Sequence, residues 1–210
     1  MSKALASAGV TPEVSVVGVD GAEFACDAPL RHDGDTTLFA MHVDTFGSSN
    51  NGSDSSVKGT DIGRFDLEKA PKVVAHLPVK GHVYDVRARR YVGFTDTIAT
   101  TLAPGYTRMY SILKAKPEPV TVDCPRTVKA GDVIRLSFAA ANSVGPQTFN
   151  VRIVDPAGKA PWRFRKNVRS VDGKGEYVFE TAFNEVRGAW RAGVTHVNTG
   201  SSREVTFSVE

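Results

Sequence analysis

The segment Trp162-Arg163-Phe164-Arg165-Lys166 alternates aromatic and basic residues and is the stretch of this sequence best suited to binding chemistry. On a β-strand, Trp162 and Phe164 would share one face and the two arginines the other, because successive side chains point to opposite sides. Exposed aromatic faces beside cations can stack against sugar rings or nucleic-acid bases. The alternative is that both aromatic side chains are core residues beneath a solvated basic face.

Catalytic motifs are not visible in the sequence. There is no G-x-S-x-G nucleophile elbow, and neither Cys26 nor Cys124 lies in a recognisable catalytic motif. Glycoside hydrolysis needs two carboxylates across a cleft, usually presented by a barrel, but the alternating βα units of a barrel are missing. We therefore expect no catalytic residue, no cofactor and no enzymatic activity in this chain.

Metal-binding patterns are weak as well. The five histidines show neither H-x-x-x-H nor H-E-x-x-H spacing. His42 and Asp44 would share a strand face, but no third ligand can be named. Asp54 and Asp61 are too far apart for a calcium loop, whose oxygen ligands are densely spaced. We expect no metal site, a polar pair at His42 and Asp44, and an exposed loop from Gly47 to Gly59.

Short alternating apolar runs between turn residues predict antiparallel β-structure with very little helix. The fold class predicted is all-β, with two tandem antiparallel β-sandwich domains. A proline-containing linker at residues 116–119 would separate a domain at 1–115 from one at 120–210. The predicted strands include Val14–Val19, Thr37–Val43, His82–Val86, Tyr91–Phe94, Ile98–Leu102, Thr107–Leu113, Val120–Val122, Val133–Phe138, Thr148–Val154, Gly175–Thr181 and Glu204–Val209.

Composition narrows the class of protein. The 210 residues are 41% apolar and 23% charged, as in globular proteins, and the net charge is only +3. That charge is a weak basis for a polyanionic partner, so no nucleic-acid partner is expected, and no apolar run is long enough to span a membrane. Cys26 and Cys124 are either two buried free thiols, which we favour, or an inter-domain bridge.

The stretch HVYDVRARRYVGFTDTIATTLAPGYTRMYSIL, residues 82–113, resembles the last strands of an all-β domain near the C-terminus of large bacterial β-galactosidase-like glycoside hydrolases. That domain has a YD…G…YLG strand pair followed by an L-x-P-G-x-x-x-x-Y-x-L strand. The segments GVTPEV (9–14) and RHDGDT (31–36) resemble its beginning.

The second half resembles the immunoglobulin-like modules appended to many extracellular proteins and polysaccharide-active enzymes. The segments VRIVDPAG (151–158) and FNEVRGAW (183–190) match a V-x-D-P-x-G hairpin and an N-D-x-x-G-x-W turn, with Glu185 in place of the usual aspartate. About seven short strands in this half also favour an immunoglobulin-like sandwich, in which Trp190 would be a core residue.

These resemblances imply a non-catalytic structural or substrate-positioning region of a carbohydrate-active protein. Its partners would be a catalytic domain of the same or a neighbouring polypeptide, and a polysaccharide. The resemblance implies an extracellular or periplasmic location. Two alternatives remain open: a carbohydrate-binding module that uses Trp162, Phe164 or the Ser/Asn-rich loop from Gly47 to Gly59, and a small hydrolase with an unrecognised site.

Overall fold

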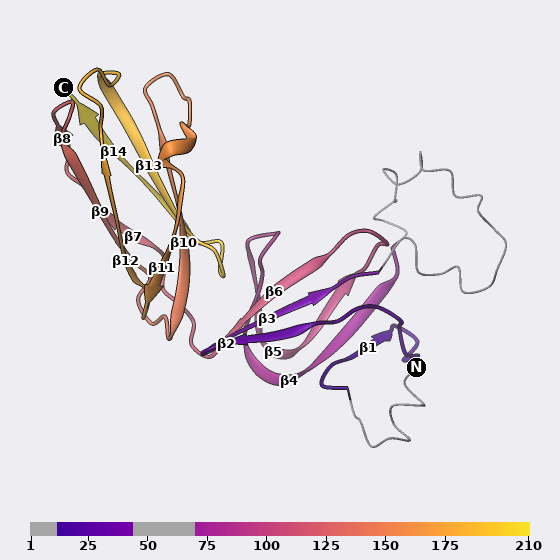
Figure 1. Cartoon of the computed structure of the whole chain (residues 1–210). Coiled ribbons are helices and arrows are strands. Elements are labelled where there is room, and N and C mark those ends of the chain that lie inside the picture. Colours follow the sequence, from indigo (N-terminus) through magenta and orange to yellow (C-terminus); the bar gives the residue numbers. More distant parts are fainter. Residues whose placement is uncertain (1–11, 44–69) are drawn as a thin grey trace, which may run out of the picture.

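The computed structural model of the chain describes residues 12–43 and 70–210, and its regular secondary structure is almost entirely β-strand (Figure 1). Within these residues the only helical element is η1 (Trp162–Phe164), a single 3-10 turn. The predicted all-β class is therefore confirmed. The predicted loop from Gly47 to Gly59 and the candidate ligands Asp44, Asp54 and Asp61 lie outside the described residues.

The first sheet has the strand order β1-β4-β6-β3-β2, and β5 pairs with the free side of β4. All its pairings are antiparallel. The long strand β4 pairs with β1 through its first half and with β6 through its second half, so the sheet folds over on itself. The strands are β1 (Ser15–Gly18), β2 (Leu30–Asp33), β3 (Thr36–Met41), β4 (Lys72–Asp85), β5 (Arg90–Thr101) and β6 (Arg108–Leu113).

The fold of this sheet encloses one hydrophobic cluster. Along β4, Val73, Ala75 and Leu77 are buried in alternation, and Val83 continues on the same side after an irregularity. Alternate side chains of a strand face one side of a sheet, so this pattern places one face of β4 in the core and leaves the other outside. The outer face later provides the candidate site.

The second sheet has the order β7-β9-β12-β11-β10-β13-β14-β8. Its strands are β7 (Thr121–Asp123), β8 (Thr127–Val128), β9 (Val133–Ala139), β10 (Pro146–Val154), β11 (Lys166–Val171), β12 (Lys174–Glu180), β13 (Gly188–His196) and β14 (Ser202–Val209). A single residue pair, Val171 with Lys174, joins β11 to β12, so the strands form two layers, β7-β9-β12 and β11-β10-β13-β14-β8. These layers correspond to the A-B-E and C-F-G arrangement of immunoglobulin domains, which confirms the predicted sandwich.

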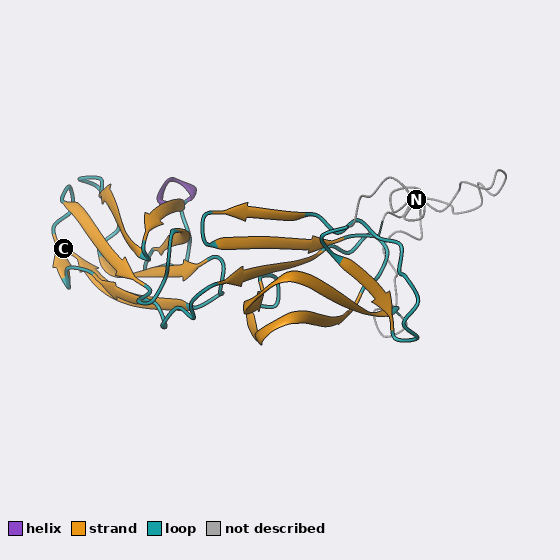
Figure 2. Ribbon diagram, turned by 90° about the horizontal axis from the view of Figure 1, so that it is seen from below, coloured by secondary structure: helices purple, strands orange, loops and turns teal. Residues whose placement is uncertain are grey.

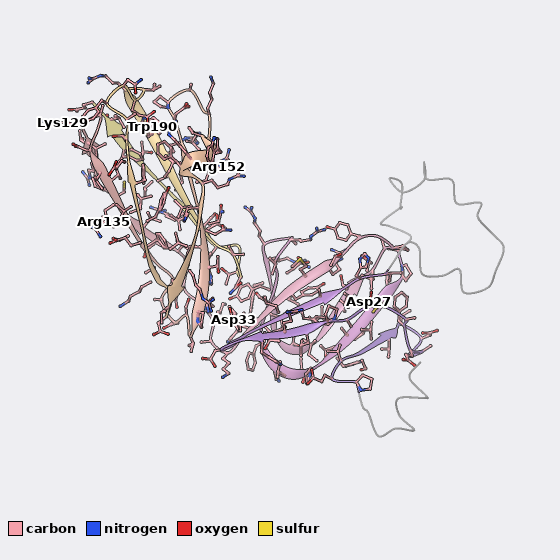
Figure 3. The ribbon with its side chains drawn as sticks, viewed as in Figure 1. Asp27, Asp33, Lys129, Arg135, Arg152 and Trp190 are labelled. Carbon is pink, nitrogen blue, oxygen red and sulfur yellow. The ribbon has the colours of Figure 1, made fainter. Side chains whose placement is uncertain are left out.

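The core of this sandwich is rich in aromatic side chains. Trp190 is almost completely buried, and its indole Nε1–H donates a hydrogen bond of 2.8 Å to the carbonyl of Val186 (Figure 3). Its ring lies 6.0 Å from Phe164 and 6.3 Å from Phe207, measured between centroids. The expected role of Trp190 as a core residue agrees with this position.

The two sheets lie end to end (Figures 1 and 2). Hydrogen bonds between polar groups join them. Asp33, at the end of β2, accepts a hydrogen bond of 3.2 Å from Arg169 (Figure 3). The Ser111 hydroxyl on β6 donates to the carbonyl of Asn198, which precedes β14. The two hydrophobic clusters share no residue, the first including Ile112 and the second beginning at Val120. The domain limits at 115 and 120 stay a prediction that folding of the separate halves would test.

A buried imidazole lies next to this junction. His196 Nε2 is 2.9 Å from Gln147 Oε1, and its Nδ1 is 2.9 Å from the Thr199 hydroxyl. The Gln147 amide nitrogen donates to the carbonyl of Val144, so the amide oxygen faces the ring and Nε2 carries the proton. Burial lowers the pKa of His196 from 6.5 to about 4, so the ring is neutral at physiological pH.

Both cysteines are free thiols, as favoured by the sequence, but they are half-buried rather than fully buried. Burial raises the pKa of each thiol, that of Cys124 to about 11, and a neighbouring aspartate raises it further. Protonated thiols of this kind are poor nucleophiles.

Candidate functional site

Trp162 and Phe164 do not form the platform that their spacing predicted. They lie in the 3-10 turn η1 and not on a strand, because β11 begins only at Lys166. Side chains in a 3-10 turn rotate by about a third of a turn per residue, so two residues separated by one position point in different directions. Trp162 is 88% exposed, whereas Phe164 is 3% exposed and packs in the core. The alternative prediction, that both aromatic side chains are core residues, is thus correct for Phe164 and wrong for Trp162.

Trp162 nevertheless lies on a well-anchored turn at the second sandwich. The neighbouring Arg163 donates two hydrogen bonds, of 3.0 and 2.7 Å, to the carboxylate of Glu185. Glu185 lies in the loop before β13, which also carries Phe183, a second highly exposed aromatic residue. Arg163 thereby ties the loop that carries Trp162 to the loop that carries Phe183.

A larger aromatic group lies on the outer face of β4 and β5. It consists of Tyr84, Tyr91, His82 and Phe94, here called the aromatic ladder. Ring centroids are 5.0 Å apart for Tyr84 and Tyr91, 6.0 Å for Tyr91 and His82, and 4.8 Å for His82 and Phe94. Phe94 is 55% exposed and Tyr91 37% exposed, whereas Tyr84 is buried. The ladder therefore presents the rings of Tyr91 and Phe94 on β5 to solvent, beside those of His82 and Tyr84 on β4.

A β-bulge aligns these rings. Phe94 pairs with His82 and Gly93 with Val83, but Tyr91 pairs with Tyr84, so Val92 is an extra residue in β5. Tyr91 and Phe94 are three positions apart and would face opposite sides of a regular strand; the extra residue brings them to the same side. Gly93 has φ of 155°, a backbone conformation that favours glycine.

The ladder is supported from behind by the first core. Val83 and Ile112 pair across β4 and β6 and are both buried on the opposite side of the sheet. At Gly81 an added Cβ would lie 2.6 Å from Ile112 and 2.9 Å from the carbonyl oxygen of Leu113, so only glycine lets β4 approach β6 here. His82 and Tyr84 thus project from a strand that is fixed by its core contacts, and β5, which carries Tyr91 and Phe94, pairs with that strand.

Polar and charged groups complete the ladder. His82 Nδ1 lies 2.9 Å from the Tyr91 hydroxyl. The ammonium group of Lys80 lies 5.5 Å from the centroid of the Phe94 ring. The ammonium group of Lys116 lies 4.6 Å from the centroid of the Tyr91 ring. Burial, with a smaller contribution from Tyr91, raises the pKa of Tyr84 to about 12, so its phenol stays protonated. Neighbouring rings are tilted by 32°, 48° and 51°, so each exposed ring suits stacking against a separate ligand face, with hydrogen-bonding groups at the edge.

Reasoning from the sequence missed this group. The residues of the ladder all fall in the segment 82–113, for which the sequence predicts strands and no binding residue. The sequence signal for the ladder is the pair of aromatic-containing segments HVYD and YVGF on either side of a turn, a pattern typical of a β-hairpin. The side of the sheet on which Tyr91 lies depends on the bulge, and a β-bulge has no distinctive sequence beyond Gly93.

Neither a cluster of metal ligands nor a membrane-spanning helix is found in the part of the chain that is described. No group of three or more His, Cys, Asp or Glu side chains among residues 12–43 and 70–210 is placed to hold a metal ion. His42 instead lies 3.1 Å from the Thr107 hydroxyl through its Nδ1. Within the same two ranges, no helix has the length and hydrophobicity to cross a membrane.

No family model matches the sequence, and no curated protein matches it. A solved β-glucosidase from Listeria innocua is similar over 57% of this chain and 18% of its own, with 13% identity and a TM-score of 0.33. A chimeric titin Z1Z2-Z1Z2 tandem is similar over 95% of this chain and 83% of its own, with 12% identity and a TM-score of 0.27. The chain thus spans less than a fifth of that β-glucosidase. With TM-scores this low, neither likeness carries an argument about function.

Proposed function

We propose that this chain is a non-catalytic region of a carbohydrate-active protein and that it holds a polysaccharide on the aromatic ladder. The observation that carries the proposal is the exposure of Tyr91 and Phe94 on a face built by a β-bulge. Large aromatic side chains gain stability from burial, and two of them are left half exposed on a rigid surface. Pyranose rings have apolar faces that can cover such rings while their hydroxyls bond to groups at the edge.

Other features are consistent with this role. The sequence of β4 to β6 resembles accessory domains of glycoside hydrolases, and the second sandwich resembles modules appended to polysaccharide-active enzymes. A catalytic domain of the same or a neighbouring polypeptide would supply the reaction, and the present chain would position the substrate. Such a protein would act outside the cell or in the periplasm, where polysaccharides are found.

The exposed Trp162 supports a second candidate for the binding site. Its turn is fixed by the Arg163 bonds to Glu185, and Phe183 lies on the same loop as Glu185. A binding module of this kind would use the second sandwich and leave the ladder unused. The two sites lie on different domains, so single substitutions can separate them.

The test compares three variants of the whole chain: Tyr91→Ala with Phe94→Ala, Trp162→Ala, and Phe183→Ala. Binding to insoluble polysaccharides is measured by pull-down, and binding to soluble ones by affinity gel electrophoresis. We expect the Tyr91/Phe94 double variant to lose retention while its circular dichroism is unchanged, and the other two variants to bind as the wild type does. Loss of binding in Trp162→Ala alone would move the site to the second sandwich. A folded wild type that binds no polysaccharide would leave only a spacer role.

A further inference from the structure

We infer that the aromatic ladder selects acidic polysaccharides, and that Lys80 and Lys116 bind their carboxylate or sulfate groups. This inference rests on the proposed function, because it names the substrate class of the same site. It goes beyond stacking, which by itself does not distinguish neutral from acidic sugars. The ligand is a chain in which a charged group recurs at the edge of stacked sugar rings.

Each of the two lysines lies over one exposed ring of the ladder. Lys80 precedes His82 in β4 and places its ammonium group over Phe94, the more exposed ring. Lys116 comes from the segment between the two sandwiches and places its ammonium group over Tyr91. Each exposed ring of the ladder therefore has one cation, supplied from a different part of the chain.

Neither cation is neutralised by a carboxylate in the described part of the chain. Within residues 12–43 and 70–210, no Asp or Glu oxygen forms an ion pair with Lys80 or Lys116. Lys114, two positions before Lys116, is neutralised, since it pairs with Asp35. The ladder therefore carries two ammonium groups that are available to an anionic ligand.

A ligand that covers Phe94 or Tyr91 must share the ring with the ammonium group or displace it. A neutral sugar that displaces it removes a cation–π contact and leaves the ammonium group without a partner. An acidic sugar can lie over the ring while its anionic group replaces that contact, and the interaction strengthens as water is excluded. The cations therefore favour acidic over neutral chains.

One acidic residue borders the site. Asp96 is exposed, two positions after Phe94 in β5, and it accepts a hydrogen bond of 3.2 Å from the Thr97 hydroxyl. It would repel an anionic group bound directly beside it. The anionic groups are therefore expected on the Lys80 and Lys116 sides of the rings.

Nucleic acid is a polyanion that could also stack on aromatic rings, but the charge pattern favours a polysaccharide. Proteins that bind single strands combine stacking with a continuous basic groove that follows the phosphates. Here one ammonium group lies over each exposed ring, and Lys114, two positions before Lys116, is paired with Asp35. Two cations, one over each exposed ring, match a chain that carries one charge per sugar better than they match a dense phosphate backbone.

The test measures binding of the whole chain to polygalacturonate and chondroitin sulfate, to neutral galactan and xylan, and to single-stranded DNA. The variants are Lys80→Gln with Lys116→Gln, and the control Lys159→Gln with Lys166→Gln, which removes the same charge from the second sandwich. We expect the wild type to bind acidic polysaccharides about tenfold more tightly than neutral ones, with the preference reduced by salt. The Lys80/Lys116 variant should lose that preference and keep its neutral binding, while the control retains it.

The outcomes separate the two proposals. Equal binding of neutral and acidic chains, unchanged in the Lys80/Lys116 variant, would overturn the inference and leave the proposed function standing. Binding of no polysaccharide at all would overturn both. Tighter binding of single-stranded DNA than of either acidic polysaccharide would overturn the choice of substrate class. If the control variant loses the acidic preference equally, net charge rather than the two lysines is responsible, and the inference is wrong.

Discussion

Acid should destabilise the second sandwich through His196, which is the only histidine among residues 120–210. Its ring is fully buried, and both nitrogens are engaged, by Gln147 and Thr199. Protonation would place a charge in this site and would require Nδ1, which accepts a hydrogen bond, to become a donor. The folded protein therefore keeps the ring neutral to a lower pH than the unfolded chain does.

The magnitude follows from the two pKa values, about 4 in the folded protein and 6.5 in the unfolded chain. Between these values the unfolded chain binds a proton that the folded chain does not, so the free energy of unfolding falls as pH falls. The contribution is fully present above pH 6.5, and it declines by up to about 1.4 kcal/mol per pH unit. By pH 4 the loss amounts to about 3 kcal/mol, a large share of the stability of a small domain.

The assay is urea unfolding between pH 7.5 and 4.5, followed by tryptophan fluorescence. Both tryptophans, Trp162 and Trp190, lie in the second sandwich, so the signal reports on that domain. His196→Gln is the control: it should be less stable at pH 7.5, because it breaks the buried network, but it should lose less stability than the wild type on acidification. Equal slopes for the two proteins from pH 6.5 to 4.5 would refute the reasoning.

The remaining predictions concern the core and the bulge. Trp190→Ala should lower the free energy of unfolding by about 3–5 kcal/mol, whereas Trp162→Ala, which removes an exposed ring, should change it by about 0.5 kcal/mol or less. Denaturation curves of the two variants measure these losses, and equal losses would contradict the prediction. Gly93→Ala should cost about 1–3 kcal/mol through backbone strain. Deleting Val92 in the Gly93→Ala variant should restore the stability, since a regular hairpin needs no positive φ at this position. Thermal unfolding followed by circular dichroism measures the stability of both variants. If the deletion restores no stability, the bulge does not explain the cost of Gly93→Ala.

The sequence predicted the β-architecture because alternation and turn residues are local signals. The strand β9, for example, buries Ile134, Leu136 and Phe138 and exposes the residues between them. Trp190 could be assigned to the core because sandwiches of this class require large aromatic side chains there. These features depend on period and size, which the sequence displays directly.

The binding residues could not be predicted in the same way. Pro161 precedes η1 and favours a turn where the alternation predicts a strand, so the side chains of Trp162 and Phe164 point in different directions. The ladder depends on the register of β5 against β4, and a shift of one residue decides which side of the sheet each ring takes. Register is a property of two paired strands, and neither strand contains it alone.

The junction between the sandwiches has a mechanical consequence. It is joined by hydrogen bonds and an ion pair, including those of Ser111 with Asn198 and Arg169 with Asp33, and not by a shared apolar core. Water can replace such contacts at modest cost, so the two bodies can change their angle without unfolding. Lys116 lies in the connecting segment and also covers Tyr91, so a molecule that engages this lysine would act on the joint itself. A ligand bound to the aromatic ladder would then limit the rotation of the second sandwich relative to the first.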